Sequence, residues 1–140
     1  MSLTRTPREV GEAWFGPMWN NRDMNLMRDL MAPDAVGHLE GGVDVIGPEG
    51  FESFMQDFLS AVPDLKLEVK NLLSDADDVC VHWRATGRHT GTGLGLLPSD
   101  AAVNFQGVTW LRVKDGRLTE GWDFWNRDGL IQTLSGAAVV

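Results

Sequence analysis

The apolar residues of this chain change their spacing about halfway along it. Before residue 63 they recur every three or four positions, as on one face of an α-helix, and the clearest such set is Phe51, Phe54, Met55, Phe58 and Leu59. From residue 65 onward apolar and polar residues alternate, which is typical of strands with one face in water. Helices followed by antiparallel strands predict an α+β domain, with the helices packed on one face of a curved sheet.

Helix caps and turn residues divide both halves into elements. Three N-terminal helices are predicted, which begin at Thr6-Pro7, Asp23 and Gly47-Pro48. Strands are expected at residues 35–39, 43–46, 65–70, 79–88, 105–113 and 118–125. The Gly-rich residues 89–102 are expected to form a loop and are a candidate flap over a pocket. A short helix capped by Asp128 is predicted to close the chain.

Length and composition exclude several classes of protein. The 140 residues show neither a repeat nor a linker, so residues 1–140 are expected to form one domain. A net charge of -8 argues against binding to nucleic acid or to an anionic membrane. The sequence holds no apolar run long enough to cross a bilayer. The single cysteine, Cys80, allows no internal disulfide, which indicates a cytoplasmic protein. One cysteine and three scattered histidines give no zinc-binding spacing, so no metal is expected.

The strongest local signal is Asp115-Gly116, which lies between two apolar runs and predicts a tight β-hairpin. The second run carries Asp123 between Trp122 and Phe124. A carboxylate within an aromatic strand must be hydrogen-bonded, paired or retained for chemistry. The interpretation of function therefore depends on Asp123.

Several segments, taken in order over nearly the whole chain, resemble the SnoaL-like polyketide cyclases of the NTF2-like superfamily. They are 47–51, 63–64, 81–91 with Arg88-His89-Thr90-Gly91, 105–108, 115–122 and 128–134. The resemblance implies a cone-shaped α+β barrel around a deep apolar pocket that takes a small hydrophobic molecule. It also implies an intramolecular aldol cyclisation that uses one acid on a late strand and no cofactor. Asp123 is the residue that best matches this acid.

The expected geometry of the hairpin supplies neighbours for that acid. A two-residue turn pairs Asp123 with Val108 and Trp125 with Gln106, and alternation places Trp110 on the same face. Partial desolvation there would raise the pKa of Asp123 towards the range used in general acid/base catalysis. These four neighbours are therefore candidate substrate-binding residues.

The remaining candidates are three histidines and one aromatic residue. His82 or His89 could donate a second hydrogen bond to the substrate, and His38 lies on an early segment that reaches the cavity in this fold. Trp14 is a candidate because the first helix lines the pocket in the family. For the histidines the competing interpretation is a structural hydrogen bond, and for Trp14 it is core packing.

Three functions remain open at this point. The first is a cyclase-like enzyme with Asp123 as its acid/base. The second is a protein that binds a small hydrophobic ligand without transforming it, and the third is an epoxide hydrolase or isomerase with the same pocket. Asp123 itself could instead face solvent or pair with Arg84 or Arg112. The outer face of the sheet is rich in apolar residues, so a homodimer through that face is expected.

Overall fold

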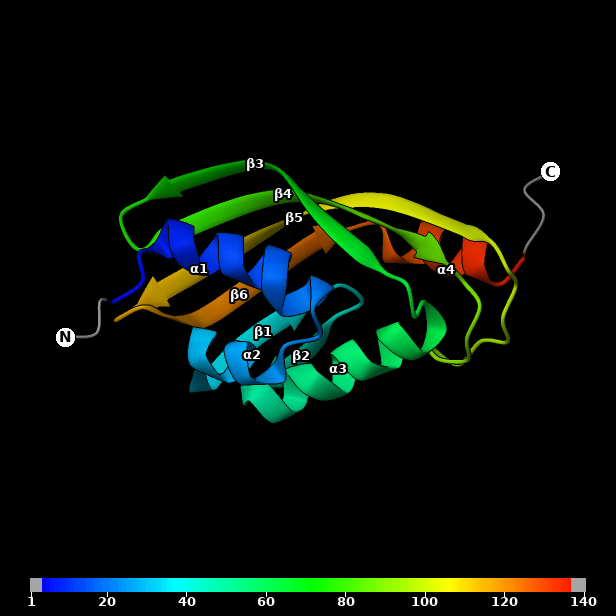
Figure 1. The fold of residues 1–140 in the computed structure, drawn as a ribbon, viewed down its shortest axis with the longest axis horizontal. Helices are drawn as coiled ribbons and strands as arrows, with labels where there is room; N and C mark the ends of the chain where they lie inside the picture. The colour runs from blue at the N-terminus through cyan, green and yellow to red at the C-terminus, as the bar shows by residue number, and fades with distance from the viewer. Residues whose placement is uncertain (1–3, 137–140) are drawn as a thin grey trace.

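The computed structural model describes residues 4–136 (Figure 1). In chain order the elements are α1 (Pro7–Ala13), the π-helical turn η1 (Trp14–Met18), α2 (Met24–Leu30), β1 (Met31–Leu39), β2 (Val43–Ile46), α3 (Gly47–Ala61), β3 (Lys66–Asp75), β4 (Asp78–Arg88), β5 (Ala102–Lys114), β6 (Arg117–Trp125) and α4 (Arg127–Leu134). The predicted α+β class and the predicted order of elements are confirmed.

The six strands form one curved sheet in the order β2-β1-β6-β5-β4-β3. Neighbouring strands run antiparallel, apart from the parallel pair β1 and β6. The sheet is strongly curved but not closed, and the N-terminal helices lie in its concave side (Figure 1). There α1 packs against β3, β4 and β5, while α3 packs against β1 and β2. A space is left between the helices and the sheet, and this space holds the candidate site.

The helix boundaries follow from local hydrogen bonds. The Thr6 hydroxyl accepts from the backbone N–H of Glu9, whose carboxylate accepts from the N–H of Thr6, which completes a capping box. Asp23 caps α2 as predicted. The predicted cap of α4 is wrong: the Asn126 side chain accepts from the N–H of Gly129, and Asp128 lies within the first turn.

Strand β1 begins earlier than the sequence indicates. The apolar spacing places Met31 on a helix, but α2 ends at Leu30 and Met31 pairs with Leu118 of β6. Both side chains are buried, at 3% exposure each. A buried helical residue and a buried strand residue cannot be distinguished by spacing at a boundary, and long-range pairing decides the outcome.

The β5–β6 hairpin has the predicted turn but not the predicted register. Asp115 and Gly116 adopt positive φ angles of 52° and 79°, which a type I′ turn requires. Val113 then pairs with Leu118 as expected, but Arg112 pairs with Glu120, so Thr119 is an extra residue on β6. This bulge reverses the faces of β6 beyond it. Asp123 therefore lies opposite Thr109 and not opposite Val108.

Candidate active site

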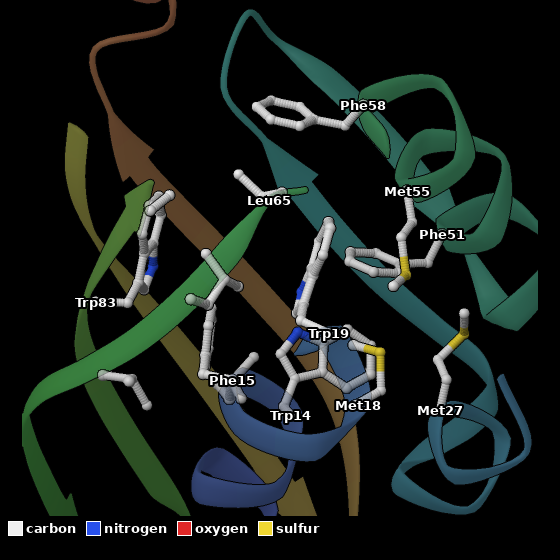
Figure 2. Packing of buried hydrophobic residues seen from close by; sticks show 14 of the residues in the cluster. Trp14, Phe15, Met18, Trp19, Met27, Phe51, Met55, Phe58, Leu65 and Trp83 are labelled. Carbon is white, nitrogen blue, oxygen red and sulfur yellow. The ribbon is translucent and has the colours of Figure 1, made fainter. Parts of the chain in front are cut away.

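A cavity lies between the concave face of the sheet and the helices, and aromatic rings form most of its wall. Its free volume is about 50 Å³, room for about four water-sized groups. It is lined by Phe15, Trp19, Phe51, Phe54, Phe58, Leu65, Leu67, Trp83, Ala85, Phe105, Thr109, Asp123 and Trp125. Figure 2 shows side chains of η1, α3 and β4 projecting into this interior from opposite sides. The wall thus holds one hydroxyl and one carboxyl, and its other side chains are apolar apart from the indole N–H groups of three tryptophans.

Two neighbouring strands hold the carboxyl in place. The Thr109 hydroxyl on β5 donates a hydrogen bond to Oδ1 of Asp123, at 2.8 Å. The same hydroxyl oxygen accepts from the indole N–H of Trp83 on β4, at 2.9 Å. Because the indole can only donate, the hydroxyl proton is directed towards Asp123. Thr109 and Trp83 are 3% and 5% exposed, so this chain of hydrogen bonds is shielded from bulk water.

Burial changes the acidity of Asp123. Its accessible surface is intermediate because the side chain borders the cavity, but protein atoms surround the carboxyl on nearly every side. The resulting desolvation raises its pKa from 3.8 to about 6. The hydrogen bond from Thr109 opposes this rise, and the negative charge of Glu40 adds to it.

Such a carboxyl can both accept and donate a proton near neutral pH. Oδ1 is held by Thr109, whereas Oδ2 has no hydrogen bond within residues 4–136. Oδ2 is therefore the atom available to a ligand in the cavity. Neither of the arginines considered as partners of Asp123 contacts it, since Arg84 bonds to Asn104 and Arg112 bonds to Asp78.

The structure places only part of the predicted site around this cavity. Asp123 and Trp125 line it, and Trp14 lines a second hollow on the other side of Asp123. The other three neighbours inferred from the hairpin lie on the outer face of the sheet and line none of these cavities: Gln106, Val108 and Trp110. Their predicted position was wrong because the bulge at Thr119 moves the register by one residue.

None of the three histidines lines the aromatic cavity. His82 lies on the outer face, where its Nε2 is 2.7 Å from Oε1 of Gln106. His38 lies on the same face between Asp44 and Glu120, at 2.9 Å and 2.7 Å.

The third, His89, is fully buried at the start of the loop, and its Nδ1 bonds to Ser99. For all three histidines the structural interpretation describes the geometry better than contact with a substrate does.

Sequence reasoning missed Thr109 and Trp83 as site residues. The register without a bulge would place Thr109 on the face opposite to Asp123, and the alternation of Trp83 with polar neighbours is that of any half-buried strand residue. The helical spacing of the α3 aromatic residues, from Phe51 to Phe58, likewise indicates a buried face without showing that part of this face lines a cavity. Side chains that pack on one side and line a cavity on the other give the same periodic signal as a solid core.

The loop of residues 89–101 borders a hollow that adjoins the aromatic cavity. A third hollow shares Phe54, Phe58 and Trp125 with the aromatic cavity. Its outer wall includes Leu94 of the loop, together with Glu40 and Arg127. Asp57 of α3 accepts a hydrogen bond from the backbone N–H of Leu94, at 3.0 Å, which attaches the loop to the helix.

Two other kinds of site are absent from the described part of the chain. No group of three His, Cys, Asp or Glu side chains is arranged to hold a metal ion within residues 4–136. Over the same residues, no helix is both long and apolar enough to cross a membrane.

Comparison with known proteins agrees with this geometry. The family model described as SnoaL-like polyketide cyclase matches residues 12–134, which include every element that contributes to the cavity. The chain belongs to this family. No curated protein matches the chain.

Solved structures of similar proteins extend the comparison. A proposed SnoaL-like polyketide cyclase from Jannaschia sp. CCS1 is 25% identical, covers 98% of this chain and 100% of its own, and has a TM-score of 0.86. AclR of Streptomyces galilaeus, a proposed hydroxylase, is 31% identical over 88% of this chain and 77% of its own, with a TM-score of 0.75.

A protein of Catenulispora acidiphila with a ketosteroid isomerase-like fold, crystallised with trimethylamine, aligns with a TM-score of 0.74 at 17% identity, over 92% of this chain and 93% of its own. The fold of this family member is therefore the NTF2-like or ketosteroid isomerase-like fold.

Proposed function

We propose that this SnoaL-like protein is a cofactor-independent enzyme that closes a ring by an intramolecular aldol reaction, with Asp123 as its general base and acid. The observation that carries this proposal is a single carboxyl, with its pKa raised to about 6, in an aromatic cavity. A cavity walled by flat rings favours a planar hydrophobic substrate. The family match supports cyclase chemistry on such a substrate.

The proposed reaction needs two proton transfers and no redox partner. Oδ2 of Asp123 removes a proton from a carbon next to a carbonyl group, and the electrons of that C–H bond form an enolate. The enolate carbon then attacks a second carbonyl carbon of the same molecule, whose π electrons become an alkoxide. Asp123 returns its proton to the alkoxide, which regenerates the carboxylate and leaves a hydroxyl on the new ring.

The hydrogen bond from Thr109 has a defined part in this cycle. It fixes one oxygen of the carboxyl, so that the other oxygen faces the cavity. It also stabilises the carboxylate form, which limits the rise in pKa that burial causes. Without this bond a larger fraction of Asp123 would be protonated at neutral pH and unable to act as a base.

The first half-reaction can be tested without the natural substrate. A bicyclic ketone, 2-tetralone, has acidic protons next to its carbonyl and carries a flat aromatic ring that suits the aromatic wall of the cavity. In D₂O the wild-type protein should accelerate the exchange of these protons for deuterium, as followed by proton NMR. Asp123→Asn should lose nearly all of this acceleration, a factor of about 10²–10⁴ for a general base. Asp128→Asn, outside the cavity, should retain it.

Two results would contradict the proposal. Exchange at the wild-type rate in folded Asp123→Asn would show that another group removes the proton. Binding of 2-tetralone without any exchange would instead favour the alternative, a protein that binds a small hydrophobic ligand and leaves it unchanged. Hydrolysis of an epoxide is a weaker alternative, because no arginine lines the aromatic cavity to assist a second acid.

We also propose that two copies of the chain associate through the outer face of the sheet. Large apolar side chains are exposed there on several strands, namely Ile46, Leu73, Val108, Trp110 and Phe124. An apolar surface of this extent is typical of an interface. Light scattering after size exclusion should give twice the chain mass of 15.4 kDa, and Phe124→Glu should lower it towards one chain. A wild-type monomer at micromolar concentration would refute the dimer.

A further inference from the structure

The cavity does not end at Asp123. A second hollow lies beyond the carboxyl, towards the β5–β6 turn, and Asp123, Thr109 and Phe51 line both spaces. We name it the back hollow; it is lined by Trp14, Met31, Gly37, Leu39, Val45, Phe51, Thr109, Leu111, Leu118, Gly121 and Asp123. Along β6 the order is Gly121, Asp123 and Trp125, so the carboxyl lies between the back hollow and the aromatic cavity.

Two glycines that face each other make room for the back hollow. Gly37 of β1 and Gly121 of β6 are partners in the parallel ladder, so two side chains are absent at the same height of the concave face. A Cβ atom at Gly121 would lie 3.0 Å from Cδ2 of Leu111, and one at Gly37 would lie 3.1 Å from Cγ2 of Val45. A methyl group at either position would therefore occupy this space or push a neighbouring side chain into it.

The lining of the back hollow determines what it can hold. Apart from the carboxyl of Asp123 and the hydroxyl of Thr109, the side chains around it are apolar. The hydroxyl of Thr109 already accepts from Trp83 and donates to Asp123, which leaves the carboxyl of Asp123 as the main polar partner for a water molecule. Because a buried water molecule typically makes about three hydrogen bonds, an apolar group suits this space better than water does. The free volume is about 30 Å³, room for about two or three water-sized groups.

From this geometry we infer that the back hollow is a subsite for a short alkyl substituent of the substrate, next to the carbon that Asp123 deprotonates, and that Gly121 and Gly37 set its length limit. This inference rests on the proposed function, because it assigns the aromatic cavity to the substrate ring. The rings of Trp14 and Phe51, whose centroids are 4.8 Å apart, close the space on the helix side. Both rings appear between η1 and α3 in Figure 2.

The proposed subsite predicts that the affinity for a ligand depends on the length of its alkyl group. Trp19, Trp83 and Trp125 line the aromatic cavity, so quenching of tryptophan fluorescence can report binding. The probes are 2-tetralone and its 1-methyl, 1-ethyl, 1-propyl and 1-pentyl derivatives, which carry the alkyl group on the reacting carbon. Dissociation constants should fall by about fourfold for each added CH₂ up to two or three carbons, as expected for burial of apolar surface. The pentyl derivative should lose this gain.

Matched glycine variants locate the effect. Gly121→Ala should remove the preference for alkyl groups, measured as the ratio of the dissociation constants of 2-tetralone and its 1-ethyl derivative. Gly37→Ala provides the same test from the other strand. Gly16→Ala is the control, because a Cβ atom there has no neighbour within 4 Å. An unchanged alkyl preference in both folded variants, or wild-type affinity that is independent of the alkyl group, would overturn the subsite.

The test of the subsite and the test of the proposed function have distinguishable results. Alkyl-dependent binding without proton exchange would contradict catalysis by Asp123 and support the subsite. Proton exchange without any alkyl preference would support catalysis and overturn the subsite. Failure of every probe to bind would overturn the subsite as well.

Discussion

Replacing Asp123 by asparagine should stabilise the folded protein at neutral pH. Asparagine has nearly the same shape and can still accept the hydrogen bond from Thr109, but it carries no charge that would have to be desolvated. The carboxyl of Asp123 has its pKa raised from 3.8 to about 6 in the folded state, so ionising it opposes folding. The variant is expected to remove that cost.

The magnitude and the pH window follow from the two pKa values. Between pH 3.8 and about 6 the folded protein binds more protons at this site than the unfolded chain does, so this contribution to stability falls as the pH rises. At 1.36 kcal/mol for each pKa unit, the cost is roughly 1 kcal/mol at pH 4.5 and reaches a plateau of roughly 3 kcal/mol above pH 6.5. On thermal unfolding the plateau corresponds to a rise in Tm on the order of 10 °C.

Urea unfolding followed by tryptophan fluorescence can measure this difference. The free energy of unfolding of Asp123→Asn minus that of the wild type should increase by about 2 kcal/mol between pH 4.5 and pH 8. Subtracting the two curves cancels the titration of groups that both proteins share. Asp128→Asn is the control and should not reproduce the increase. A difference that stays constant over this range would show that Asp123 is not desolvated as the structure indicates.

Two further predictions concern hydrogen bonds to titrating groups. Thr109→Val removes a bond that lowers the pKa of Asp123, so the rise of the 2-tetralone exchange rate with pH should have its midpoint at higher pH. An unmoved midpoint would show that Thr109 does not affect the acidity of Asp123. Hydrogen bonds to Glu120 and Asp44 raise the pKa of His38. The protonated imidazole therefore stabilises the fold fully below pH 6.5, and this contribution is lost as the pH rises through the pKa of the folded state. His38→Gln should accordingly lower the Tm at pH 6 more than at pH 9, and an equal loss at both pH values would refute an ionic contribution.

The sequence was informative wherever a signal is local. The helical spacing of Phe51 to Leu59, the cap at Thr6 and the turn at Asp115-Gly116 each depend on a few adjacent residues, and the structure confirms all three. The order of these elements was sufficient to predict the α+β class. The parallel pairing of β1 with β6 was not predicted, because it joins residues more than 80 positions apart.

The site was harder to predict because one extra residue, Thr119, exchanges the inner and outer faces of the rest of β6. Both faces of β6 carry aromatic side chains, with Trp122 and Phe124 outside and Trp125 inside, so alternation gives no sign of the bulge at Thr119. Asp123 does line the cavity, as expected, but the register from which this was inferred lacked the bulge. Without the bulge, the register set by the turn would place its side chain on the outer face.

The titration of the Asp123 carboxyl tests the central claim most directly. Carbon-13 labelling of the aspartate side chains, with Asp123→Asn used to assign the resonance, would allow its chemical shift to be followed against pH by NMR. The account predicts a midpoint near 6, well above the ordinary value of 3.8, and a higher midpoint in Thr109→Val. A midpoint near 4 would contradict it, because the carboxyl would then be solvated and too weak a base for the proposed reaction.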